Sequence, residues 1–209
     1  MSLKKLGAKL IGLLPMIGDK KMKAKAVTGS AGVHFVAYRL SAMGYIVALT
    51  REGAPAVDLM VYSPKSGKSV SIQVKTASNA SPLPGKKEKK NGLLNWRLSK
   101  KALELKGKGV FYAFVDLKGC AADQPKPQET PDVFIVPAEW VANPEHRNIP
   151  NSETALGSLN VYPKDKPPSD FWFDLYPKGR KKWCEKWELI TNILGRAAAE
   201  PSSAAQRQD

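Results

Sequence analysis

The chain has 209 residues, of which 43% are hydrophobic, so it is long enough for one domain with a buried core plus extensions. Its 33 lysines and arginines outnumber 19 acidic residues and give a formal net charge of +14, which favours a nucleic acid or another polyanion as the partner. The spacing of the two histidines and two cysteines assembles no zinc site, and no apolar run is long enough to span a membrane. We therefore expect a soluble, cytoplasmic protein without a structural disulfide.

The predicted elements, in chain order, begin with a basic N-terminal extension over residues 1–26. A helix over residues 29–43 follows, because Val33, Val36, Ala37 and Leu40 have the spacing of one helical face. Further along the chain, strands are expected near residues 45–50, 56–62, 69–76, 110–116 and 132–137, and helices near residues 99–105 and 182–194.

Three stretches lack a regular pattern, namely a loop over residues 77–92, an irregular connection over residues 143–169 and a disordered tail over residues 196–209. The domain then covers residues 27–195. Its predicted fold class is α/β, with a mixed sheet of about five strands flanked by helices.

Residues 56–76 predict a β-hairpin with polar groups on one face. If Ser63 pairs with Lys68 around the turn, Asp58 lies opposite Gln73, and Lys75 falls on the same face two residues later. The alternating apolar residues then point to the other face. Singly, an aspartate or a lysine on a strand is ordinary surface, but their coincidence on one face favours a functional site.

A basic stretch, with lysines at positions 86, 87, 89 and 90, follows this hairpin. It is typical of a loop that flanks bound nucleic acid. Trp96 and Arg97 interleave an aromatic ring with the charge, which suits stacking on unpaired bases. The alternative is a solvated linker, with the tryptophan in the core. The candidate nucleic-acid contacts are Lys86, Lys87, Lys89, Lys90, Trp96 and Arg97.

Asp58 followed on the next strand by Gln73-Val74-Lys75 resembles the PD-(D/E)XK nuclease superfamily in its QxK variant. The sequence GSAGVHFVAYRL at residues 29–40 resembles the first helix of that superfamily, and residues 109–142 are similar to small bacterial and phage-type members. The resemblance covers residues 27–142. It implies a restriction endonuclease-like or Holliday-junction-resolvase-like core, cytoplasmic and of bacterial or phage type.

The resemblance implies a divalent-metal site in which Asp58, Gln73 and the main-chain carbonyl of Val74 hold Mg²⁺ or Mn²⁺. Lys75 would orient or activate the attacking water. Mg²⁺ prefers hard oxygen ligands, and a nearby lysine stabilises negative charge that develops on phosphate. Relatives carry a glutamate where this chain has Val33, so Glu52 or His34 would have to replace that ligand.

Two functions follow as hypotheses. The first is an endonuclease whose substrate is a nucleic acid, with DNA favoured over RNA, and the resemblance allows a homodimer because cutting two strands needs two sites. The alternative is a nuclease-fold protein that has lost catalysis and acts as a nucleic-acid-binding module. A third hypothesis is an interaction protein whose basic surface meets a membrane or an acidic partner.

Overall fold

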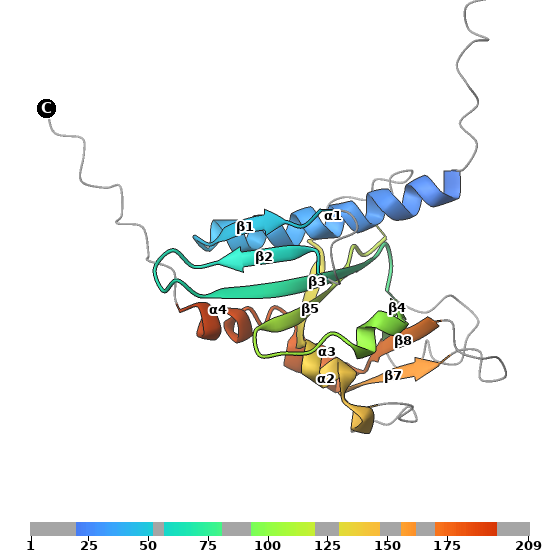
Figure 1. The fold of residues 1–209 in the computed structure, drawn as a ribbon. Coiled ribbons are helices and arrows are strands. Elements are labelled where there is room, and N and C mark those ends of the chain that lie inside the picture. Colours follow the sequence, from blue (N-terminus) through green and yellow to red (C-terminus); the bar gives the residue numbers. More distant parts are fainter. Residues whose placement is uncertain are drawn as a thin grey trace, which may run out of the picture.

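The computed structural model describes residues 20–51, 57–80, 93–119, 130–146, 156–161 and 170–195 (Figure 1). The predicted tail, Glu52 and the lysines at positions 86–90 lie outside the described residues. Two β-sheets and four α-helices form the described structure. No helix among the described residues is both long and apolar enough to cross a membrane.

The larger sheet has the strand order β1-β2-β3-β5-β6. Its strands are β1 (Ile46–Leu49), β2 (Leu59–Tyr62), β3 (Ser69–Ala77), β5 (Val110–Asp116) and β6 (Asp132–Pro137). β3 and β5 are parallel and the other neighbours are antiparallel, so the sheet is mixed. The α/β fold class with a five-stranded mixed sheet is confirmed. The hairpin register is also as predicted, with Leu59 opposite Ile72 and Tyr62 opposite Ser69.

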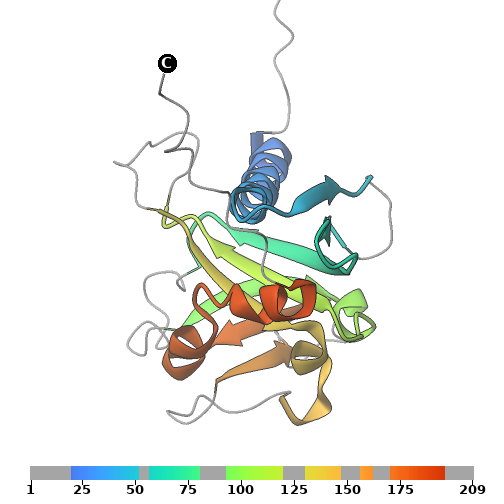
Figure 2. The ribbon, with the colours of Figure 1, turned by 90° about the vertical axis from the view of Figure 1, so that its left-hand side faces the viewer.

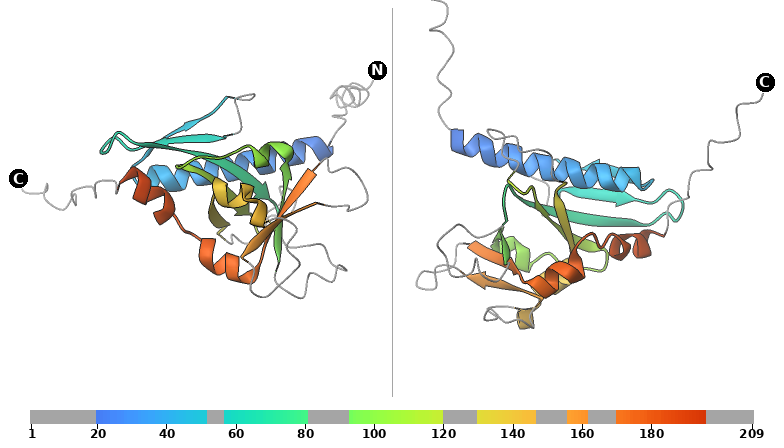
Figure 3. Two further views of the ribbon diagram at one scale, coloured as in Figure 1. Left: turned by 60° about the horizontal axis from the view of Figure 1, so that its bottom comes forward. Right: turned by 180° about the vertical axis from the view of Figure 1, so that it is seen from behind.

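Helix α1 (Lys20–Ala42) crosses one face of this sheet, and Figure 3 shows it from behind. Val36 and Leu40 are completely buried there, which confirms the predicted helical face. The helix begins at Lys20 rather than near residue 29. Lysine, methionine and alanine before Val27 are good helix formers, so part of the predicted basic extension is helical.

The two faces of the larger sheet cover separate hydrophobic clusters. On the α1 side, β2 and β3 contribute the apolar residues Leu59, Val61, Val70, Ile72 and Val74. On the opposite side, β5 and β6 contribute Tyr112, Phe114, Phe134 and Val136. Alternation along each strand directs successive side chains to these two clusters.

A smaller sheet covers the second cluster, with the order β4-β8-β7. Its strands are β4 (Leu94–Ser99), β8 (Asp170–Leu175) and β7 (Gly157–Val161). The phenyl rings of Phe114 and Phe173 stack across the two sheets with centroids 4.3 Å apart. Such a pair contributes about 0.5–1.5 kcal/mol beyond the area it buries.

The smaller sheet was not predicted, and it corrects two expectations. The irregular connection over residues 143–169 contains β7, and the helix expected over residues 99–105 is a 3-10 turn at Lys100–Leu103. In β4 the side chains of Leu94, Trp96 and Leu98 are buried and alternate with polar ones, so a period-two signal was present in the sequence.

The C-terminal helix predicted over residues 182–194 is two helices, α3 (Pro177–Trp183) and α4 (Glu188–Leu194), visible in Figure 2. The break occurs because the N–H of Glu185 donates to the carbonyl of Val133 on β6, 2.8 Å away, instead of to a helical carbonyl. Oε2 of Glu185 also accepts hydrogen bonds from Arg39 on α1 at 2.5 Å and from Nε1 of Trp187 at 2.8 Å. The bond from Arg39 ties the break to α1. Two further short helices, α2 (Ala138–Ala142) and the 3-10 turn Pro144–His146, follow β6.

Candidate functional site

Asp58 lies directly before β2, and its main chain is held from both sides. Its N–H donates to the carbonyl of Ile72, and its own carbonyl accepts the N–H of Thr50, each at 2.9 Å. The hydroxyl of Thr50 also donates to the carbonyl of Val57 at 2.6 Å. Thr50 thereby fixes the backbone that presents Asp58, a role that no pattern in the sequence indicates.

The carboxylate of Asp58 takes the place of a missing strand partner. The paired residues of β2 end at Leu59, opposite Ile72, so β3 continues past the end of its neighbour. There the N–H of Val74 donates to Oδ2 of Asp58 at 2.7 Å, and Nε2 of Gln73 donates to the same oxygen. The predicted meeting of Asp58 and Gln73 is confirmed as a direct contact.

Two oxygens converge on the side-chain amide of Gln73. Its Nε2 lies within hydrogen-bonding distance of Oδ2 of Asp58 and 3.3 Å from the carbonyl oxygen of Val74. A half-turn of the amide replaces this nitrogen with an oxygen. The three groups that the family resemblance assigns to a metal therefore lie together, and all three supply hard oxygen donors of the kind that Mg²⁺ and Mn²⁺ prefer.

Lys75 lies two residues further along β3 and is partly buried. Burial lowers the pKa of its ammonium group from the ordinary value of 10.5, because desolvation disfavours the charged form, while the nearby negative charge of Asp58 opposes this effect. Burial is the stronger of the two influences. Nζ of Lys75 therefore releases a proton more readily than that of an exposed lysine.

The site lies where one face of the larger sheet changes from covered to uncovered. In the parallel pairing of β3 with β5, Gln73 lies beside Tyr112 and Lys75 lies beside Phe114. Both aromatic residues are buried beneath the smaller sheet. Toward the other edge, Met60 and Tyr62 of β2 are exposed on the same face. One flank of the site is thus a packed core and the other is an accessible strand surface.

The residues of α1 that the sequence suggested for this site are not gathered there. Val33 packs against the cluster on the α1 side, whereas Gln73 and Lys75 project from the opposite face of the sheet. His34 is exposed on α1. Glu52 lies outside the described residues. Within the described ranges, no three histidine, cysteine, aspartate or glutamate side chains are grouped for a metal ion.

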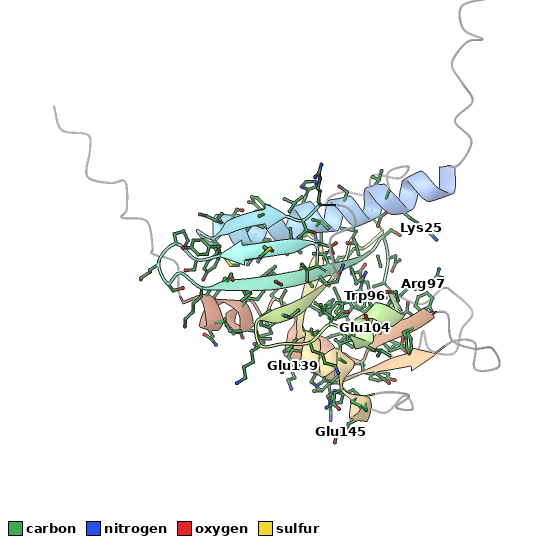
Figure 4. All side chains as sticks on the ribbon, in the orientation of Figure 1. Lys25, Trp96, Arg97, Glu104, Glu139 and Glu145 are labelled. Carbon is green, nitrogen blue, oxygen red and sulfur yellow. The ribbon has the colours of Figure 1, made fainter. Side chains whose placement is uncertain are left out.

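Trp96 is a core residue, which corrects the expectation that it stacks on unpaired bases. It is only 2% exposed, its Nε1 donates to the carbonyl of Val115 at 3.0 Å, and its ring packs against Phe114 and Phe134. Arg97, the next residue on β4, is exposed, as Figure 4 shows. Of the candidate contacts in the basic stretch, Arg97 is the one that the structure leaves on the surface, and Lys86, Lys87, Lys89 and Lys90 lie outside the described residues.

Comparison with known proteins gave no match to a family model, to a curated protein or to a solved structure.

Proposed function

We propose that this protein is a divalent-metal-dependent nuclease that hydrolyses phosphodiester bonds in DNA. The observation that carries the proposal is the convergence of the Asp58 carboxylate, the Gln73 amide and the Val74 carbonyl beside a lysine of lowered pKa. The resemblance of Asp58 and Gln73-Val74-Lys75 to the PD-(D/E)XK superfamily supports the same activity. The net charge of +14 suits a phosphate backbone as substrate.

The residues of the chain have separate parts in this proposal. Asp58, Gln73 and the Val74 carbonyl would hold Mg²⁺ or Mn²⁺, which supplies positive charge next to the phosphate oxygens. Nζ of Lys75 orients the attacking water and takes up its proton when neutral, which its lowered pKa makes easier than for an ordinary lysine. The Val74 N–H fixes the carboxylate of Asp58, so that it does not have to be ordered when the substrate arrives.

The test is cleavage of end-labelled single-stranded, duplex and branched DNA in Mg²⁺ or Mn²⁺. Lys75→Met removes the amine with little change in side-chain volume, and Lys186→Met is a matched control because Lys186 forms a partly exposed ion pair with Glu188 at 3.0 Å, outside the candidate site. We expect the native protein and Lys186→Met to cleave, and Lys75→Met to lose at least about 100-fold in rate. Equal rates for native protein and Lys75→Met would refute the proposed role of Lys75.

A second candidate function is nucleic-acid binding without cleavage, and the position of Val33 favours it. This side chain packs into the apolar cluster on the far face of the sheet, so Asp58 is the carboxylate that the described structure places at the site. A pure binder would retain salt-sensitive DNA affinity and leave every DNA form intact in Mg²⁺ and Mn²⁺. That result in the cleavage assay would replace the first proposal with this one.

A further inference from the structure

The face of the larger sheet that carries the site also exposes apolar side chains on β1 and β2. Met60 is 50% exposed and Tyr62 is 42% exposed, and both project from the same face as Asp58 because they follow it at two-residue intervals. Ile46 of β1 is 57% exposed and lies directly opposite Tyr62. The three side chains form an apolar strip, named here the open strip, that leads along β2 toward the site.

The structure accounts for this exposure. In Figure 1, α1 lies above β2 and β3 and behind β1, and the smaller sheet lies below, next to β5. The smaller sheet covers the β5–β6 half of this face, where Tyr112 and Phe114 are buried. The β1–β2 half carries the open strip. Exposed apolar side chains grouped on one sheet face are characteristic of a surface that binds a partner.

Exposed lysines lie in the turn at the end of the strip remote from Asp58 and in a loop beside the start of β3. Lys65 and Lys68 are exposed in the turn between β2 and β3. Lys106 and Lys108 are exposed in the loop before β5, and this loop lies against β3 because the carbonyl of Gly109 accepts the N–H of Ser71 at 2.9 Å. Among the described residues, none of these four lysines forms an ion pair. Their charge is available to an anionic partner.

We propose that the open strip binds the unpaired bases of a nucleic-acid strand whose backbone continues to Asp58 and Lys75. This inference rests on the proposed function, which makes the ligand a nucleic acid. It adds that the bound segment is single-stranded. Tyr62 offers a ring on which a base stacks, Met60 and Ile46 pack beside it, and the four lysines meet the phosphates. At about 3.3 Å per residue, Tyr62 and Asp58 lie roughly 13 Å apart along the chain, a separation that a strand of a few nucleotides spans.

Charge and chemistry favour this occupant over two others. A duplex keeps its base faces stacked inside, so an exposed ring and two aliphatic side chains on a flat strand surface give it little to contact. A second copy of the chain carries the same net charge of +14 and would bring its own lysines against Lys65 and Lys68. A single strand supplies both exposed bases and negative charge.

The test is the affinity of the full chain for a fluorescent oligothymidylate and for a duplex of the same length, measured in EDTA so that no cleavage occurs. Tyr62→Leu removes the ring and keeps an apolar residue, and Tyr62→Phe keeps the ring. Tyr38→Leu is the matched control, because Tyr38 is 67% exposed on α1, on the other side of the sheet. We expect Tyr62→Leu to weaken single-strand binding about tenfold, with Tyr62→Phe and Tyr38→Leu close to the native protein and duplex binding unchanged.

The lysines give an independent measurement. Lys65→Ser and Lys68→Ser should each lower the slope of log affinity against log salt concentration by about 0.7 on single strands, and they keep the test decisive if Tyr62→Leu proves unstable. Equal losses in Tyr62→Leu and Tyr38→Leu, or equal losses on duplex and single strand, would overturn the proposal. So would a dimer that Tyr62→Leu dissociates without a change in affinity, since the strip would then be an interface between copies.

Binding and cleavage separate this inference from the proposed function. Tyr62-dependent single-strand binding by a protein that never cleaves DNA would support the open strip and refute the nuclease. Cleavage by the native protein, together with a single-strand affinity that Tyr62→Leu does not change, would support the nuclease and refute binding at the open strip.

Discussion

The carboxylate of Asp58 accepts a hydrogen bond from the main-chain N–H of Val74 at 2.7 Å. This bond completes the pairing of β3 at the point where β2 has ended, so Asp58 is part of the sheet as well as part of the candidate site. A loss of activity in the Asp58→Ala variant could therefore result from misfolding or from the loss of a catalytic group. The two roles separate when the substitution keeps the acceptor and removes the charge.

Asp58→Asn should keep the fold and abolish cleavage. Its side-chain oxygen still accepts the N–H of Val74, whereas Asp58→Ala leaves that buried donor unpaired at a cost of about 1–3 kcal/mol. Urea unfolding should place Asp58→Asn within about 0.5 kcal/mol of the native protein and Asp58→Ala well below it. Full cleavage activity in a stably folded Asp58→Asn would contradict the assignment of Asp58 to the site.

Gln73→Glu should make the stability of the protein depend on divalent metal. The native amide donates to Oδ2 of Asp58, and a carboxylate at the same place repels Asp58 unless a cation lies between them. The variant should melt below the native protein in EDTA and recover as Mg²⁺ or Mn²⁺ is added. The same titration on the double variant Asp58→Asn/Gln73→Glu is the control, and a metal response as large in the double variant would exclude a shared site.

The stability difference between the native protein and Lys75→Met should narrow as pH rises. Burial penalises the charged amine, so the variant should be the more stable protein at neutral pH. Between the lowered pKa of Lys75 and its ordinary value of 10.5, the folded state binds fewer protons than the unfolded state, so native stability rises with pH in that window. Urea unfolding of both proteins at pH 7 and pH 10 measures the effect. A difference that stays constant would show that burial does not shift this pKa.

Two glycines of α1 should respond to alanine in opposite directions. A Cβ at Gly32 would overlap Oγ1 of Thr76 on β3, whereas a Cβ at Gly29 meets nothing within 4 Å. Gly29→Ala should stabilise the protein by about 0.5–1 kcal/mol through helix propensity, and Gly32→Ala should destabilise it by about 1–3 kcal/mol. Thermal or urea unfolding of the pair decides this, and Thr76→Ala should partly rescue Gly32→Ala because it removes Oγ1 and Cγ2 but keeps the Cβ of residue 76. Stabilisation by both alanines would mean that α1 does not approach β3 so closely.

The sequence by itself determined the hairpin and its polar face. Alternation and turn residues fix a strand register locally, because a slip by one residue would move every apolar side chain of β2 and β3 out of the core. Asp58 and Gln73 therefore met as predicted. The five strands of the larger sheet also carry their own period-two or continuous apolar patterns, which is why the fold class followed from the sequence alone.

Tertiary structure decided what the local patterns leave open. The alternation of β4 places Trp96 on one face with Leu94 and Leu98, but only the packing of that face against Phe114 and Phe134 makes it the core face. Likewise, helical spacing predicts that Val33 faces the sheet. It does not predict that Gln73 and Lys75 project from the opposite face of that sheet. The helix break at Glu185 depends on a hydrogen bond to Val133, which is distant in the sequence. The pKa of Lys75 and the exposure of Tyr62 depend on which element covers each half of the larger sheet. Contacts between segments far apart in the chain decide this.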